Sequence, residues 1–206
     1  MDYIEQAPIM EQRELFLLAE SEFSEENDWI FDKTGGTFRT MYNDMLCVVR
    51  VTTEKLTDRA EVIEDFEGKK IPVEVECPCL SVSIQTVFQQ KPSKFIEEVM
   101  EHVSSMLQEQ FDHLITQAFR IQKRKKRKRE WWEASMLGSL VFQSEVGGNV
   151  LTDAVIEYLE GGARILVGLL SLLQEHEQKC PKELAKRIVH WEPPKSISRS
   201  VGLTIV

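Results

Sequence analysis

Seven adjacent cations are the most distinctive chemical feature of the sequence: Lys123, Arg124, Lys125, Lys126, Arg127, Lys128 and Arg129. Like charges in a run repel one another, and a polyanion that neutralises them relieves the repulsion. Such cations contact phosphates without reading bases, so we expect binding that is sensitive to salt and nearly blind to sequence. Trp131 and Trp132 follow directly, and their rings could stack on exposed bases. The run and the tryptophan pair are therefore the candidate nucleic-acid-binding residues.

Two other interpretations of the basic run stay open. The run resembles a monopartite nuclear localisation signal, which would make a transport receptor its partner. It could also be a solvated or self-associating surface. Trp131 and Trp132 could equally be core or oligomer contacts, or lie at a membrane interface. DNA, RNA, another polyanion and a receptor thus all remain candidate partners.

The cysteines and histidines offer a weaker candidate for metal or thiol chemistry. Cys77 and Cys79 are two apart, and His176 and Cys180 are four apart on a predicted helix, which together could supply four zinc ligands. The gap between Cys77 and Cys79 is tighter than usual for zinc, and strand residues two apart simply share a face. No signature of a catalytic cysteine surrounds any of them. We therefore expect free thiols, no metal and no other cofactor.

The sequence shows no convergent set of polar groups that would predict a reaction centre. Paired carboxylates occur in acidic, polar surroundings that are typical of solvated faces: Glu25–Glu26, Glu64–Asp65 and Glu97–Glu98. The glycine pairs lack the Lys-Ser/Thr that accompanies a phosphate-binding loop. An enzyme is therefore the third of the functions that we consider.

Charge and composition limit the type of protein. The net charge is −9, and without the seven cations of the run the remaining 18 basic residues face 34 acidic ones, a balance of −16. Any polyanion contact should therefore be confined to the run. The N-terminus lacks the features of a signal peptide, and the longest apolar stretch, residues 163–173, is too short to cross a bilayer. These features predict a cytoplasmic or nuclear protein.

Residues 1–91 have the pattern of a small, mostly antiparallel sheet with a flanking helix. Gly35 and Gly36 can adopt positive φ and indicate a hairpin turn between two apolar segments. Later segments alternate apolar and polar residues, as half-buried strands do. The predicted elements are a helix over 10–23, a hairpin around Gly35–Gly36, a strand over 45–52, a helix over 53–66, and strands over 71–76 and 80–85.

Residues 92–206 have a helical pattern, which makes the predicted fold α+β with a long-helix C-terminal half. One helix could run from residue 93 into the basic run, about 50 Å at ~1.5 Å per residue. Its apolar stripe would be exposed on such a projection, so it predicts a homo-oligomer interface. The stripe residues are Phe95, Val99, Val103, Met106 and Leu114.

Further helices are predicted over 153–178, with a weak point at Gly161–Gly162, and over 181–191. Residues 200–206 have a β-like pattern that could add an edge strand. The length of 206 residues suits one continuous structural unit.

Taken together, these patterns favour surfaces over a reaction centre. The favoured hypothesis is a non-enzymatic accessory or structural component of a nucleic-acid-handling or virion-like assembly, which contacts phosphates through the basic run. The alternative is an intracellular protein–protein adaptor whose run is only a nuclear import signal.

Overall fold

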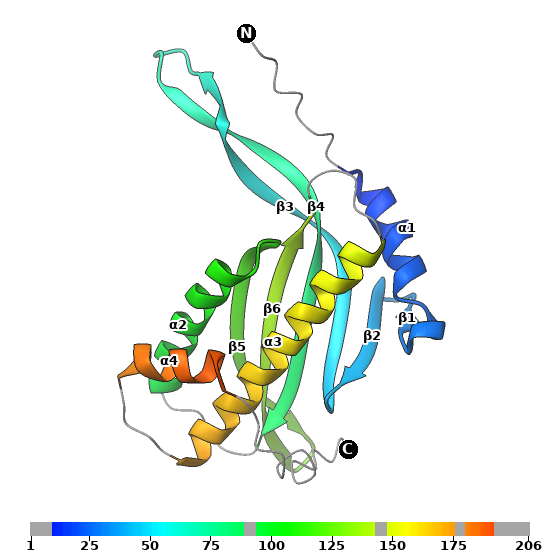
Figure 1. The fold of residues 1–206 in the computed structure, drawn as a ribbon, viewed down its shortest axis with the longest axis vertical. Coiled ribbons are helices and arrows are strands. Elements are labelled where there is room, and N and C mark those ends of the chain that lie inside the picture. The colour runs from blue at the N-terminus through cyan, green and yellow to red at the C-terminus, as the bar shows by residue number, and fades with distance from the viewer. Residues whose placement is uncertain (1–9, 89–93, 143–147, 176–179, 192–206) are drawn as a thin grey trace.

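The computed structural model describes residues 10–88, 94–142, 148–175 and 180–191. Within them, six strands form one antiparallel sheet with the order β1-β2-β3-β4-β6-β5, and four α-helices are interleaved with the strands (Figure 1). The fold is therefore α+β, as predicted. The strands are β1 (Ile30–Asp32), β2 (Thr37–Tyr42), β3 (Met45–Glu64), β4 (Lys70–Phe88), β5 (Leu114–Lys126) and β6 (Arg129–Val141). The helices are α1 (Gln12–Glu22), α2 (Lys94–Gln110), α3 (Gly148–Glu175) and α4 (Pro181–Val189).

The first hairpin confirms the prediction made from the glycine pair. β1 pairs with β2, and Asp32 closes the turn because its Oδ1 accepts a hydrogen bond from the Thr34 amide at 3.0 Å. Gly36 has φ +58°, a conformation that glycine adopts without steric cost. The third predicted strand is the start of β3, which pairs with β2.

The helix predicted over 53–66 is wrong, because residues 53–64 belong to β3 and residues 65 and 66 begin the turn that follows it. The strand spans 20 residues and pairs with β4 to its end, so the two strands predicted over 71–76 and 80–85 are one strand of 19 residues. Beyond the sheet, β3 and β4 continue as a two-stranded arm, residues 53–76 (Figure 1). β-branched residues favour a strand here: Thr52, Thr53 and Thr57. Pairing with β4 outweighs the weaker helical pattern of the segment.

The long helix predicted from residue 93 into the basic run is also wrong. α2 ends at Gln110, and the chain turns at Phe111, whose carbonyl accepts a hydrogen bond from the Leu114 amide at 3.1 Å. β5 then begins, and the basic run lies on a β-hairpin. Apolar residues at 114, 118 and 119 fit helical spacing as well as a strand, so periodicity alone could not separate the two. The helices are spread through the chain, and there is no long-helix C-terminal half among the described residues.

The helices α1, α2 and α3 cover one face of the sheet, and α4 packs against α2 and α3 (Figure 1). α3 runs diagonally across the sheet in close contact with β4 and β6. The predicted weak point at Gly161–Gly162 does not interrupt α3. A Cβ on Gly162 would collide with the Ile84 side chain, so this glycine lets the helix approach the sheet. The predicted edge strand over 200–206 lies outside the described residues.

Candidate nucleic-acid interface

The basic run occupies the tip of the hairpin formed by β5 and β6. Lys126 pairs with Arg129 across a two-residue turn, and Arg127 adopts a left-handed conformation with φ +56°. All seven cations are exposed. The strand registers place this tip and the arm at opposite ends of the sheet (Figure 1). At one end β4 extends beyond its last β6 partner, Val141, into the arm. At the other end β5 and β6 extend beyond Phe88, the last residue of β4, into this turn.

The three cations furthest from the turn form ion pairs within the hairpin, in which they share two carboxylates. Glu130 Oε2 lies 2.6 Å from Lys123 Nζ, and Glu130 Oε1 lies 3.7 Å from Lys125 Nζ. Arg124 donates two hydrogen bonds to Glu133, at 3.1 and 3.2 Å. The hydrogen bond from Lys123 and its charge lower the pKa of Glu130, and the bond to Glu133 raises the pKa of Arg124.

The four cations at the turn differ from these three. Within the part of the chain that the structure describes, no ion pair involves Lys126, Arg127, Lys128 or Arg129. We call these four residues the hairpin tip. Because their mutual repulsion is uncompensated there, the hairpin tip is the part of the basic run best suited to an anionic partner. A second role needs no partner: β5 is an edge strand, and lysines on an edge discourage pairing with other chains.

The two tryptophans do not form one stacking platform. Trp131 pairs with Arg124 and Trp132 pairs with Lys123, and neighbouring residues on a strand point to opposite faces of a sheet. Both are half-buried. At most one of the rings can therefore share a face with a given nucleic-acid strand.

The stripe predicted as an oligomer interface lies against the chain's own core. Val99 and Val103 are 0% exposed and Leu114 is 4% exposed, while Phe95 and Met106 are partly buried against the same cluster. The prediction assumed that the stripe was exposed on a projecting helix. That premise is wrong, because α2 packs on the sheet and α4 packs on α2.

The cysteines do not form a metal site within the described residues, where no group of three potential ligands is close enough. Cys77 and Cys79 are buried on one face of β4, and His176 lies outside the described residues. Burial raises the pKa of Cys77 and Cys79, which disfavours the thiolate. Thr52 Oγ1 lies 3.1 Å from Cys79 Sγ. Both residues are thus protonated core thiols near neutral pH.

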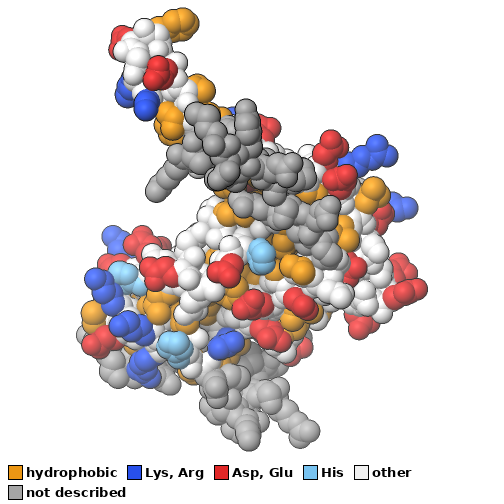
Figure 2. Space-filling view, turned by 45° about the horizontal axis from the view of Figure 1, so that its top comes forward, with side chains coloured by type: hydrophobic (Ala, Val, Ile, Leu, Met, Phe, Trp, Pro, Cys, Tyr) orange, Lys and Arg blue, Asp and Glu red, His pale blue; other side chains and the backbone are white. Residues whose placement is uncertain are grey.

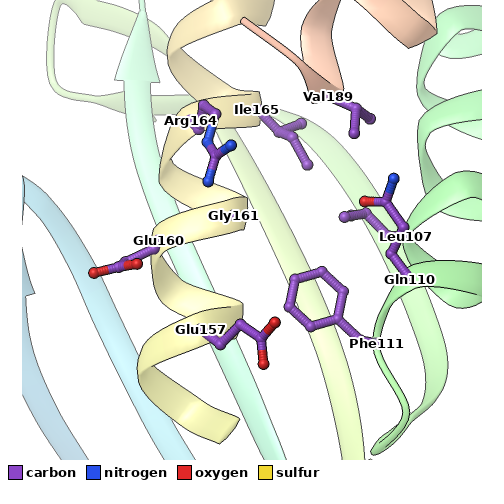
Figure 3. Close-up of a pocket in the computed structure, with 9 residues that line it drawn as sticks. All are labelled: Leu107, Gln110, Phe111, Glu157, Glu160, Gly161, Arg164, Ile165 and Val189. Carbon is purple, nitrogen blue, oxygen red and sulfur yellow. The ribbon is translucent and has the colours of Figure 1, made fainter. Parts of the chain in front are cut away.

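A hollow between α2, α3 and α4 is the candidate that sequence reasoning missed (Figure 3). It has a volume of about 310 Å³ and is walled by Leu107, Phe111 and Ile165, with Glu157 and Arg164 at its rim. Glu160 also lines it, and all three charged residues are exposed, so their charged groups are solvated. Its residues come from three helices, and no local sequence motif could have assembled them.

No helix among the described residues is both long and apolar enough to cross a membrane. Neither family models, nor curated proteins, nor solved structures gave a significant match to the chain.

Proposed function

We propose that the protein is a non-enzymatic accessory or structural component of a nucleic-acid-handling or virion-like assembly, and that its hairpin tip binds phosphates. The observation that carries the proposal is the concentration of four exposed cations, outside any ion pair among the described residues, at one end of the molecule. The rest of the chain beyond the basic run carries −16, so a polyanion is repelled from other approaches.

The shape of the site supports backbone contacts in preference to base reading. A two-stranded β-ribbon fits the major groove of duplex DNA, and its flexible lysines reach phosphates on either side. Base reading requires planar side chains held at fixed positions, whereas the cations of the hairpin tip lie on an exposed turn. We therefore expect DNA and RNA to bind without sequence preference.

The test is the salt dependence of binding. In the tip variant, Lys126, Lys128 and Arg129 become Gln, and Arg127 becomes Asn, which tolerates a positive φ. Each phosphate contact contributes a slope of about −0.9 to the log–log plot of affinity against salt for duplex DNA, so losing four should flatten it by roughly three to four. Fluorescence anisotropy with labelled DNA and RNA at several salt concentrations measures this.

A control variant with the same change in net charge separates local contact from overall charge. It replaces four exposed lysines elsewhere with Gln: Lys69, Lys70, Lys182 and Lys186. This variant should keep the wild-type slope, because its lysines lie away from the hairpin tip. Equal affinities of wild type and the tip variant at every salt concentration would contradict the proposal.

The alternative function is an adaptor whose basic run is a nuclear import signal. In that case the wild-type protein has negligible affinity for nucleic acid at physiological salt. The tip variant would then change only where a tagged protein accumulates in a nucleated cell. Imaging of the two proteins beside the anisotropy measurement therefore distinguishes the two functions.

A further inference from the structure

The arm carries an apolar tip that the described part of the chain leaves exposed. Phe66 is fully exposed, and Val62, Ile63 and Ile71 are 45%, 58% and 40% exposed. Figure 2 shows hydrophobic side chains on this projection, far from the body of the molecule. An exposed phenylalanine at a turn does not stabilise the fold, whereas burying this side chain in an interface would stabilise the complex by about 1.5–3 kcal/mol. An exposed cluster of this kind indicates a binding surface.

The turn at the arm's end holds Phe66 in place. Asp65 Oδ1 accepts hydrogen bonds from the amides of Glu67 and Lys69 at 2.9 and 2.8 Å, and the Asp65 amide donates to the Lys69 carbonyl at 3.0 Å. Gly68 has φ +74°, as this turn requires. Because the backbone is fixed by these bonds, Phe66 is presented without a large loss of conformational entropy on binding.

The charge of the arm restricts the partner. Residues 53–76 include eight acidic and four basic residues, a net charge of −4. Nucleic acid and anionic lipid surfaces are therefore repelled from the arm. The complementary surface is an apolar hollow with cations at its rim.

The fold contains such a hollow at the base of the arm. It has a volume of about 460 Å³ and lies between α1 and the β1–β2 turn, with Phe16 and Val51 as apolar walls and Arg13 and Arg50 at the rim. The nearest carboxylates of α1, Glu11 and Glu14, are engaged in the capping box of that helix. The hollow thus has both the apolar wall and the positive rim that the arm tip needs.

The arm cannot reach the hollow of its own chain. Arg50 and Phe66 are 16 residues apart on an extended strand, which corresponds to roughly 50 Å at ~3.3 Å per residue. The two ends of the arm could meet only if the β3–β4 pairing were lost. A second copy of the chain can supply the hollow without any rearrangement.

We propose that Phe66 of one copy docks into the Phe16–Val51 hollow of a second copy, with the carboxylates of the arm tip beside Arg13 and Arg50. In each copy the hollow lies at the base of the arm. When the arms of two copies lie antiparallel, the tip of each arm therefore lies beside the hollow of the other copy. This arrangement closes with two-fold symmetry. Both β5–β6 hairpins remain at the outer ends of the pair, so the inference is independent of what they bind.

Self-association is measured by analytical ultracentrifugation over a wide concentration range, without nucleic acid. The wild-type chain should form dimers, and Phe66→Ser should weaken dimerisation roughly a hundredfold to ten-thousandfold, as expected from losing two buried phenylalanines, one at each contact of the symmetric pair. The control Ile156→Ser removes an exposed apolar residue from α3, away from both surfaces, and should dimerise like wild type. Circular dichroism establishes that the variants are folded.

Mixing two defective variants tests the pairing of tip with hollow. Phe66→Ser keeps an intact hollow and Arg13→Glu keeps an intact tip, so a mixed pair has one intact contact, whereas each variant alone has none. Mixed dimers should therefore exceed either homodimer, and adding Glu67→Arg to Arg13→Glu should restore dimerisation. A monomeric wild type, unchanged dimerisation of Phe66→Ser, no gain on mixing, or Phe66-dependent binding to neutral lipid vesicles without dimerisation would each overturn the proposal.

Discussion

Tyr158 of α3 packs against Gly138 of β6, and this contact holds the helix close to the sheet. The Tyr158 side chain is 1% exposed, and its hydroxyl donates a hydrogen bond of 2.7 Å to Gln117 Oε1 on β5. Gly138 pairs with Gln117, and a Cβ added to it would lie 2.5 Å from Tyr158 Cζ. Real Cβ contacts are essentially never shorter than 3.0 Å. The substitution Gly138→Ala must therefore displace the ring or the strand.

The expected effect is a loss of stability. Replacing a strand glycine by alanine gains about 0.5–1 kcal/mol from the lower entropy of the unfolded chain. Overpacking a core costs about 1–3 kcal/mol, and a displaced ring would separate the buried Tyr158 hydroxyl from Gln117, at about 1–3 kcal/mol for the lost hydrogen bond. We expect Gly138→Ala to lower the free energy of unfolding by about 1–3 kcal/mol.

Urea denaturation of four proteins in a double-mutant cycle measures this effect. In a Tyr158→Leu background the ring is absent, so Gly138→Ala should cost little or become slightly stabilising. Gly35→Ala is the control, because the nearest atom to its Cβ, Thr37 Oγ1, lies at 3.4 Å. The reasoning would be refuted if Gly138→Ala left the free energy of unfolding unchanged. It would also be refuted if Gly138→Ala lowered that free energy equally in the wild-type and Tyr158→Leu backgrounds.

Three further predictions concern one buried hydroxyl and the thiols. Thr86 Oγ1 is buried and has no hydrogen-bond partner among the described residues, so Thr86→Val should raise the free energy of unfolding by about 1 kcal/mol in urea denaturation, and lower stability would contradict the assignment. Cys180 is the exposed thiol and should react with iodoacetamide well before Cys47, Cys77 and Cys79, as peptide mass spectrometry can establish. Burial raises the pKa of Cys47 to about 12. The folded protein thus keeps a proton that the unfolded chain loses above about pH 8.5, and stability should fall with rising pH more steeply in wild type than in Cys47→Ala.

Several parts of the fold were predictable because their signals are local. Gly36 required a turn, and the apolar spacing of residues 153–178 and 181–191 suits helices that lie on a core. α4 begins at its predicted first residue, whereas α3 begins five residues before its predicted start.

The candidate site was predictable in composition but not in geometry. Seven consecutive cations are visible in the sequence, yet their division into three paired and four unpaired among the described residues depends on Glu130 and Glu133 across the hairpin. Likewise, Trp131 and Trp132 are adjacent in sequence and separated in space because a strand alternates its faces.

The sequence by itself determined the charge pattern of this protein, its first hairpin and the amphipathic character of α2, α3 and α4, because these depend on residue types at short spacing. Only the tertiary structure decided that residues 53–64 and 114–126 are strands, since a strand is stabilised by partners distant in sequence. Tertiary packing also buried the α2 stripe and left Phe66 exposed. Whether an apolar residue is exposed depends on how the whole chain packs around it. No local sequence pattern could therefore have shown that the arm tip is exposed and that the α2 stripe is buried.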